Sequence, residues 1–294
     1  VHAVDDVSFT LGRGKTLGVV GESGCGKSTI GRVILQLIKP TSGSVKFNGR
    51  EIVGLRSGEM RHLRKEMQMI FQDPYSSIDP RRTVNQIIGE PLRVHKIRPD
   101  RAAREERVLE LMETVGLAER LINAYPHELD GGRRQRVGIA CALAVEPSFI
   151  VCDEPVSALD VSIQAQILNL LKHLQQQIGL TYIFITHDLS VVNHFSDDIA
   201  VMYLGQVVEL TSAEELFAKP LHPYTQALLS AIPVPKIGAK KERIILKGEI
   251  SSPIDPPDQC RFAKRCLYAT DECRAKCPPL REAAPGHQVA CWRV

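Results

Sequence analysis

The sequence predicts an α/β fold: a mainly parallel sheet that carries a helical subdomain and is followed by a small cysteine-rich extension. Over residues 1–235, short apolar runs alternate with helical patterns, which is typical of a parallel sheet with crossover helices. A long helical stretch, from Thr83 to Ala144, interrupts this alternation. Five of the eight cysteines lie beyond residue 259.

The first expected elements are short strands separated by glycines. Apolar runs predict strands at Val4–Thr10, Lys15–Val20, Ser44–Phe47 and Glu66–Phe71. A Gly-rich loop follows the second run and opens a helix expected over Lys27–Ile38. The pair Asn48-Gly49 is typical of a β-hairpin turn.

Helical periodicity dominates the middle of the chain. The strongly charged segment 101–115 is apolar at Val108, Leu111, Met112 and Val115. A second helix is expected where apolar residues recur at three- and four-residue steps: Ile163, Ile167, Leu170, Leu174 and Ile178. Further strands are expected at Phe149–Cys152, Thr181–Ile185, Ile199–Tyr203 and Gln206–Leu210.

The composition changes near residue 235, where we expect a domain boundary. Basic residues, then prolines and then cysteines replace the strand–helix alternation. We therefore expect one domain over residues 1–235, with a helical subdomain at about 76–146, and a cysteine-rich extension over residues 236–294. Because the chain starts with Val1 and not with Met, we expect it to be part of a longer protein.

Composition and charge exclude several classes of protein. Hydrophobic residues make up 44% of the chain and charged residues 24%, which is typical of a globular protein and excludes a disordered or fibrous one. The formal net charge of +3, from 37 basic and 34 acidic residues, is too small to argue for nucleic acid. No apolar run reaches the roughly 18 residues that a membrane-spanning helix needs, and the N-terminus has no signal pattern.

A phosphate-binding loop is expected between the strand that ends at Val20 and the helix that follows. The tract matches the pattern G-x-x-x-x-G-K-[ST]. Its residues are Gly21, Glu22, Ser23, Gly24, Cys25, Gly26, Lys27, Ser28 and Thr29. In such a loop, backbone N–H groups and the helix N-terminus face the phosphates. Lys27 brings a charge to the β- and γ-phosphates, and Ser28 offers its hydroxyl to Mg²⁺.

Two carboxylates end an apolar run far along the chain. Asp153 and Glu154 follow Phe149–Cys152, which predicts a buried strand. A carboxylate at such a strand end can hold Mg²⁺ through water, and the next one can polarise an attacking water. Alone this pattern is weak evidence. With the phosphate loop upstream, it indicates a nucleotide triphosphatase.

These residues, with other motifs in order, resemble the ATPases of ATP-binding-cassette (ABC) transporters over residues 1–235. The resemblance implies the ABC-type P-loop domain, with antiparallel strands beside its parallel core, and ATP and Mg²⁺ as ligands. It implies that Glu154 is the general base and that Asp153 assists Ser28 in holding Mg²⁺. Gln72 resembles the Q-loop glutamine, which joins metal coordination to contact with the membrane subunit, and His187 resembles the switch histidine. In this family, two such domains form a head-to-tail sandwich around ATP.

The signature motif departs from the family pattern. The family sequence begins Leu-Ser-Gly-Gly-Gln, whereas this chain has Leu129, Asp130, Gly131, Gly132 and Arg133. In the sandwich the signature serine donates a hydrogen bond to the γ-phosphate held by the other subunit, whereas an ionised Asp130 can only accept. We therefore expect a heterodimer with a second, homologous ABC ATPase, in which Asp130 makes one site degenerate. The alternative is that Asp130 points away and Arg133 binds, which leaves both sites competent.

Other family features are the D-loop and the adenine contact. The tract Ser157–Asp160 resembles the D-loop, so Asp160 is expected at the nucleotide. The family's aromatic residue that stacks on adenine would lie just before residue 1. Phe9 is better explained as part of the core.

Two further tracts resemble the oligopeptide/dipeptide importers of the family. They are Pro220–Pro233 and the cysteine-rich extension that begins at Gln259. The resemblance implies peptide import with two transmembrane permease subunits, served by an extracytoplasmic peptide-binding protein. It places the chain peripherally at the cytoplasmic face of the cell membrane, with a permease helix docked near Phe71–Pro80. Nickel or another small solute remains open as cargo. An ABC ATPase acting on nucleic acid is less favoured, because tandem cassettes and a clustered basic surface are missing.

The cysteines of the extension predict a metal site. Without a secretory signal, a metal site is favoured over disulfides, and reduced thiols without metal are the simpler alternative. The spacing favours neither a zinc knuckle nor a common ferredoxin motif, so the residues indicate only a shared soft metal. The importer resemblance implies a 4Fe–4S cluster held by Cys260, Cys266, Cys273 and Cys291, with Cys277 as the spare. Phe262, Tyr268 and Trp292 would shield the cluster or pack the extension onto the ATPase.

Overall fold

The computed structural model describes residues 1–73, 75, 78–232, 243–246, 248 and 252–294, and these form two compact units. The first unit consists of Val1–Leu11, Lys15–Ile30 and Phe184–Val294. The second consists of Gly12–Gly14 and Gly31–Ile183. The domain boundary expected near residue 235 lies outside the described residues, as do Pro74, Ser76 and Ser77 of the expected docking region.

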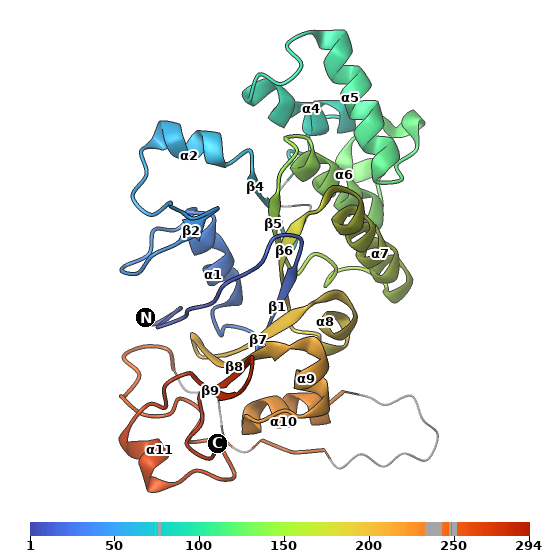
Figure 1. The fold of residues 1–294 in the computed structure, drawn as a ribbon. Helices are drawn as coiled ribbons and strands as arrows, with labels where there is room; N and C mark the ends of the chain where they lie inside the picture. The colour runs from blue at the N-terminus through green and yellow to red at the C-terminus, as the bar shows by residue number, and fades with distance from the viewer. Residues whose placement is uncertain (74, 76–77, 233–242, 247, 249–251) are drawn as a thin grey trace. The chain divides into compact units, whose positions relative to one another are not determined.

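The first unit is built on a mixed sheet (Figure 1). Its parallel pair is β1 (Thr16–Val20) with β7 (Asp198–Tyr203), and all five residues of β1 are buried. A two-residue turn at Leu204 and Gly205 leads to β8 (Gln206–Ser212), which is antiparallel to β7. The strands predicted at Lys15–Val20, Ile199–Tyr203 and Gln206–Leu210 are therefore confirmed, whereas the strand predicted at Val4–Thr10 is not. That segment forms no regular strand, because Asp6 has a φ of 51° that breaks its extended course.

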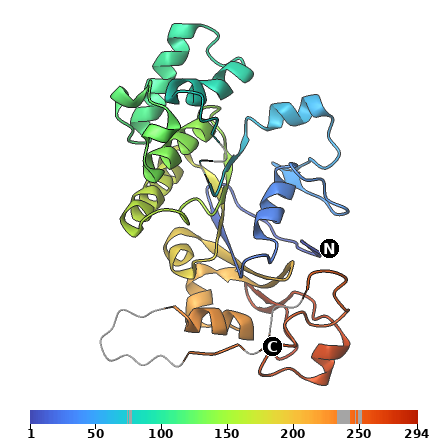
Figure 2. The same ribbon diagram turned by 180° about the vertical axis from the view of Figure 1, so that it is seen from behind.

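The extension adds two strands to the edge of this sheet. Strand β10 (His287–Val289) pairs antiparallel with β8, and β9 (Arg281–Ala284) pairs with β10. Figures 1 and 2 show this red end of the chain beside β8 in both views. The buried Glu209 of β8 accepts a hydrogen bond from His287 Nε2 at 2.7 Å and others from the backbone N–H groups of Leu221 and His222. The extension is therefore part of the same folded unit as the strands that precede it.

The helices of the first unit are short. They are α8 (Leu189–Phe195), α9 (Ala213–Ala218), α10 (Pro223–Ser230) and α11 (Asp271–Ala275). The helix opened by the phosphate loop, α1 (Lys27–Ile34), begins in this unit and ends in the second. It is shorter than expected, because the chain turns at Gln36, whose φ is 54°. No helix in the described ranges is long and apolar enough to cross a bilayer.

The second unit combines parallel strands with helices. Strand β4 (Met67–Ile70) is parallel to β5 (Phe149–Asp153), and β6 (Thr181–Thr186) begins here and ends in the first unit. The predicted Asn48-Gly49 hairpin is confirmed: it joins β2 (Lys46–Phe47) to β3 (Arg50–Glu51), and both turn residues have positive φ. Helix α2 (Ser57–Leu63) was not predicted, because a seven-residue helix with only Met60 and Leu63 buried gives little periodicity.

The expected helical stretch is confirmed as three α-helices and two 3₁₀ turns. The α-helices are α4 (Val84–Val94), α5 (Arg101–Thr114) and α6 (Gly131–Leu143), and the turns are Glu119–Leu121 and Pro126–Glu128. These helices pack on one another, with Val108, Leu111 and Met112 of α5 buried as their spacing predicts. Helix α7 (Val161–Ile178) follows β5 and ends at Gly179, whose φ is 69°.

Candidate functional site

The phosphate-binding loop lies directly after the buried strand β1 and is pressed against two other backbone segments of the first unit. A Cβ atom at Gly26 would lie 2.0 Å from the carbonyl oxygen of Ala3, and one at Gly21 would lie 2.2 Å from that of Met202. The N–H of Gly205 donates to the carbonyl of Cys25 at 2.8 Å. Only glycine fits at Gly21 and Gly26, because any side chain would displace a neighbouring main chain.

Lys27 lies buried at the start of α1, with its ammonium group inside the curve of the loop. Its Nζ donates to the carbonyl oxygens of Gly21 at 2.8 Å and of Glu22 at 3.0 Å. These bonds hold a positive charge beside the N-terminus of α1, where the backbone N–H groups of the first turn have no helical partner. The loop is therefore organised to receive an anion.

The second unit brings Gln72, Asp153 and Glu154 together. Asp153 is the last residue of β5 and is buried, and its Oδ2 lies 4.0 Å from Nη2 of Arg32. Glu154 Oε2 accepts a hydrogen bond from Gln72 Nε2 at 3.0 Å. The φ of Glu154 is 46°, a conformation that is costly for a residue with a side chain and recurs at functional sites. Asp153 and Glu154 thus present their carboxylates at one strand end.

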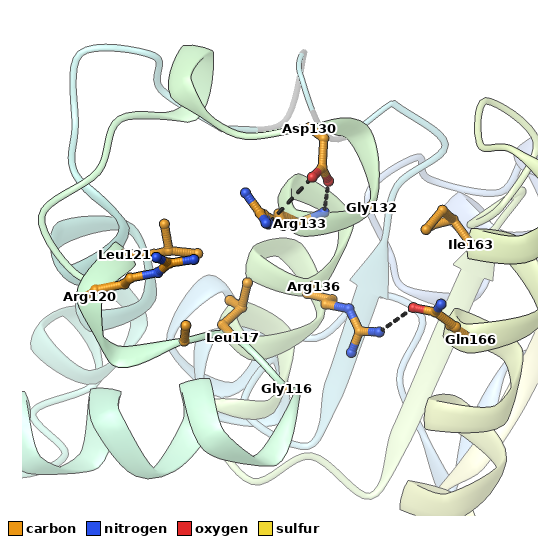
Figure 3. Close-up of a pocket in the computed structure, with 11 residues that line it drawn as sticks. Gly116, Leu117, Arg120, Leu121, Asp130, Gly132, Arg133, Arg136, Ile163 and Gln166 are labelled. Atoms are coloured by element: carbon orange, nitrogen blue, oxygen red, sulfur yellow. Dashed lines mark hydrogen bonds and ion pairs between the residues drawn. The ribbon is translucent and has the colours of Figure 1, made fainter.

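The signature residues open helix α6. Asp130 is its N-cap: Oδ1 accepts from the N–H of Arg133 at 2.7 Å, and Oδ2 lies 3.3 Å from Nε of the same arginine. Figure 3 shows this pair at the edge of a pocket of about 320 Å³, into which the unit also brings Arg120 and Arg136. Asp160 is the N-cap residue of α7. The Asp130 carboxylate is thus engaged by its own helix N-terminus and by one cation.

Close packing between α6 and α7 explains the signature glycines. A Cβ at Gly132 would lie 2.6 Å from Cγ2 of Ile163, and one at Gly131 would lie 3.1 Å from Cδ2 of Leu159. The start of α6 is therefore held against the D-loop tract and the first turn of α7. By contrast, a Cβ at Gly138 in the same helix would meet nothing within 4 Å.

Another predicted site residue, His187, is exposed and lies directly after β6 in the first unit. The next residue, Asp188, caps α8 by accepting from the N–H of Ser190 at 2.8 Å. The phosphate loop and His187 belong to the first unit, whereas Gln72, Asp130, Asp153, Glu154 and Asp160 belong to the second. Each group is organised within its own unit.

Each of the five cysteines of the extension lies close enough to at least one other for their charges to interact. Burial first, and then the charges of neighbouring thiolates, raise the pKa of Cys260 to about 12. Burial also raises the pKa values of Cys266 and Cys291, to which the charge of Cys273 contributes in both cases. The backbone N–H of Tyr268 donates to Cys266 Sγ at 3.4 Å, and Thr270 Oγ1 lies 3.4 Å from Cys273 Sγ.

The fifth cysteine of the extension is engaged elsewhere. Cys277 Sγ donates to Gln206 Oε1 at 3.5 Å, at the start of β8, although its charge also acts on Cys260. Within the described parts of the chain, no three His, Cys, Asp or Glu side chains are arranged to hold a single metal ion. Cys273 and Cys291 are buried, whereas Cys260 and Cys266 are half-buried. Thiols with hydrogen-bond donors to sulfur have the donor chemistry of an iron–sulfur site, whose ligands surround several metal atoms.

The three aromatic residues of the extension do different things. Phe262 is buried and packs against Tyr203 and Tyr224, with ring centroids 5.2 and 5.4 Å apart, so it fixes the extension to the first unit. The guanidinium carbon of Arg293 lies over the ring of Tyr268, 3.8 Å from the ring centroid. Trp292 Nε1 donates to the carbonyl of Lys276 at 3.2 Å.

Sequence reasoning missed three side chains around these groups. Arg32 lies beside Asp153, and both Tyr224 and Arg265 hold Glu22 of the phosphate loop. Tyr224 stands in the Pro220–Pro233 tract, and Arg265 directly precedes Cys266. Both tracts resemble the oligopeptide/dipeptide importers, which indicated that they matter. The contact of the two side chains with the loop could not be predicted, because it depends on long-range folding.

Comparison with known proteins gives consistent matches. The sequence model of the ABC transporter family matches residues 4–157, and that of the oligopeptide/dipeptide transporter C-terminal region matches residues 208–273. The chain is 54% identical over 294 residues to the oligopeptide transport ATP-binding protein AppF of Bacillus subtilis, covering 99% of this chain and 89% of that protein. It is also 54% identical to the probable peptide ABC transporter ATP-binding protein y4tS of Sinorhizobium fredii, over 99% of this chain and 82% of y4tS.

Solved structures show the same fold. The ATP-binding cassette MJ0796, in a dimeric post-hydrolysis state bound to ADP and Pi, matches with a TM-score of 0.65 and 32% identity, over 72% of this chain and 90% of that chain. The protein cbiO1 of Clostridium perfringens, part of the transporter complex cbiONQ, matches with a TM-score of 0.67 and 29% identity, over 74% of this chain and 84% of that chain.

The close approach at Gly132 gives a testable prediction. We expect Gly132→Ala to slow ATP hydrolysis at least tenfold and to lower the free energy of unfolding by about 1–3 kcal/mol, because the added methyl group collides with Ile163. Adding Ile163→Ala should recover part of the activity by removing the collision. Gly138→Ala, in open space on the same helix, is the control and should leave stability equal or higher. Equal behaviour of the Gly132 and Gly138 variants in urea unfolding and ATPase assays would contradict the packing argument.

Proposed function

Because this chain belongs to the ABC transporter ATPases, we propose that it is the ATP-hydrolysing subunit that energises import of di- and oligopeptides. The observation that carries this proposal is the likeness to oligopeptide transport proteins over 99% of the chain, the cysteine-rich extension included. The match of residues 208–273 to the oligopeptide/dipeptide transporter C-terminal region supports it independently. The alternatives that the experiments must exclude are import of another small solute and action on nucleic acid.

The chemistry follows from the charges that the two units hold. Lys27 and the loop N–H groups bind the β- and γ-phosphates, and Ser28, Gln72 and Asp153 supply oxygen ligands for Mg²⁺. When bound, Mg²⁺ neutralises charge on the phosphates during transfer. Glu154, held by Gln72, accepts a proton from the attacking water, and His187 contacts the γ-phosphate. The remaining proposed ATP contacts are those of the main chain of the loop, together with Asp130, Gly131, Gly132, Arg133 and Asp160.

The general-base assignment predicts a split between binding and turnover. We expect Glu154→Gln to leave ATP affinity within twofold and to slow hydrolysis by about 10²–10⁴, because the amide can still accept from Gln72 but cannot take a proton. Lys27→Ala should weaken ATP binding instead. Glu146→Gln, an exposed carboxylate of the same unit, is the control. Hydrolysis at the parent rate by the Glu154→Gln complex would show that another group is the base.

The partners proposed for this chain are two permease subunits and a second, homologous ATPase at the cytoplasmic face of the membrane. An extracytoplasmic peptide-binding protein acts through the permease. Phe71 and Tyr75, large side chains that are 42% and 50% exposed around the Q-loop, are proposed to contact a permease helix. Co-purification of the chain with both membrane subunits, and cross-links from a cysteine at Phe71 to one of them, would support this. Cross-links to the second ATPase alone would contradict it.

The second ATPase is proposed to differ from this chain, because Asp130 replaces the family's signature serine. A carboxylate about 4 Å from a phosphate charge is repelled by about 4 kcal/mol at an effective dielectric near 20. Two facts reduce this figure: the Asp130 side chain is 61% exposed, and Arg133 lies 3.3 Å from it. The repulsion that remains between Asp130 and the phosphate still favours two unequal sites. The site completed by Asp130 is the slower one.

Unequal sites predict unequal losses when each general base is disabled in the assembled complex. We expect Glu154→Gln in this chain to remove most of the turnover, because its site is completed by the partner's signature. Disabling the partner's base should remove little. Asp130→Ser should raise hydrolysis at the weaker site. Equal losses from the two base substitutions would contradict the asymmetry.

We also propose that Cys260, Cys266, Cys273 and Cys291 hold a 4Fe–4S cluster with a structural role. The engagement of Cys277 with Gln206 supports this ligand set. Anaerobically purified protein should contain about four irons per chain. Cys266→Ser should lose the iron, whereas Cys277→Ser should keep it. Zinc in place of iron, or loss of iron in Cys277→Ser, would overturn the assignment.

A further inference from the structure

The side chain and the backbone of Glu22, the second residue of the phosphate loop, are both held from outside the loop. Arg265 of the extension forms a two-point ion pair with it: Nη1 lies 2.7 Å from Oε2, and Nη2 lies 3.0 Å from Oε1. The N–H of Glu22 donates to the hydroxyl oxygen of Tyr224 in α10 at 2.9 Å. A bidentate pair of this kind fixes direction as well as distance.

Arg265 is itself largely buried by neighbouring side chains. Its side chain is only 9% exposed, and its guanidinium carbon lies 5.8 Å from the ring of Tyr203. Phe262, three residues earlier, is buried against Tyr203 and Tyr224. A buried guanidinium without an anion beside it is strongly unfavourable. The folded extension therefore places the Arg265 charge where the Glu22 carboxylate compensates it.

The charge of Glu22 matters because the loop receives phosphates. The carbonyl of Glu22 accepts from Lys27 Nζ at 3.0 Å, so its carboxylate belongs to a residue that already shapes the anion site. An uncompensated carboxylate in a partly buried site repels a nearby phosphate charge. Arg265 therefore offsets a repulsion that the loop's own sequence creates.

The extension also contacts the turn that supports the loop at Cys25. Arg261 donates to the carbonyl of Leu204 and pairs with Asp5. The adjacent Gly205 donates its N–H to Cys25 at 2.8 Å. Two arginines of the extension thus support the phosphate loop. Arg265 contacts Glu22 directly, and Arg261 contacts the turn that binds Cys25.

We propose that Arg265 is a positioning residue for ATP binding: it fixes Glu22 and neutralises its carboxylate, so that the cysteine-rich extension sets the affinity of the phosphate loop. The inference rests on the proposed role of this loop in binding ATP. Arg265 itself need not touch ATP.

The test is a double-substitution cycle in the complete transporter. We expect Arg265→Gln to raise KM for ATP, and the Kd of a fluorescent ATP analogue, about fivefold to tenfold with kcat within twofold. Adding Glu22→Gln to Arg265→Gln should return both constants to within about twofold of the parent, because the unpaired carboxylate is gone. Arg265→Lys keeps the charge but loses the two-point contact, so its KM and Kd should lie between those of the parent and those of Arg265→Gln.

Lys264→Gln is the matched control, because it removes a charge from the exposed neighbour of Arg265. It should leave both constants unchanged. An unchanged Kd in Arg265→Gln would overturn the proposal. A raised Kd that Glu22→Gln does not lower would also overturn it. Such a result would indicate that Arg265→Gln unfolds the extension, because a substitution in the loop cannot refold it. Failure of the parent complex to bind the analogue would instead contradict the proposed ATP-binding role.

Discussion

Direct backbone contact shapes the phosphate-binding loop, and the other features of the site depend on that contact. Gly21 and Gly26 let the loop approach the carbonyl oxygens of Met202 and Ala3, at distances that a side chain would not permit. The resulting curve places the Lys27 ammonium against the carbonyls of Gly21 and Glu22. Because these contacts join main chains that are far apart in sequence, the loop acquires its shape only when the whole first unit folds.

The cysteine-rich extension is part of that folding. Its last strand pairs with β8, its Phe262 packs into the aromatic group around Tyr203, and its Arg265 reaches Glu22. The buried Glu209 ties the same strand to the Pro220–Pro233 tract through the N–H groups of Leu221 and His222. Through these contacts the extension can influence the phosphate-binding loop, although it lies more than 200 residues away from it in sequence. This gives the extension a physical role without an electron-transfer step.

Local chemistry made most of the fold predictable from sequence. The hairpin at Asn48-Gly49 and the buried face of α5 follow from short-range rules, and both are confirmed. Val4–Thr10 was predicted wrongly, because its alternation of apolar residues does not reveal that Asp6 breaks the strand. The partners of Glu22 could not be predicted: Arg265 lies 243 residues away, and no local pattern encodes a contact over such a separation.

The proposed function requires that ATP hydrolysis by this chain drives peptide uptake. The most direct measurement is hydrolysis by the complete transporter in vesicles, recorded together with accumulation of a labelled oligopeptide supplied on its binding protein. We expect peptide to raise hydrolysis and uptake to rise in proportion to the ATP consumed. Stimulation by nickel or another small solute but not by peptide would contradict it.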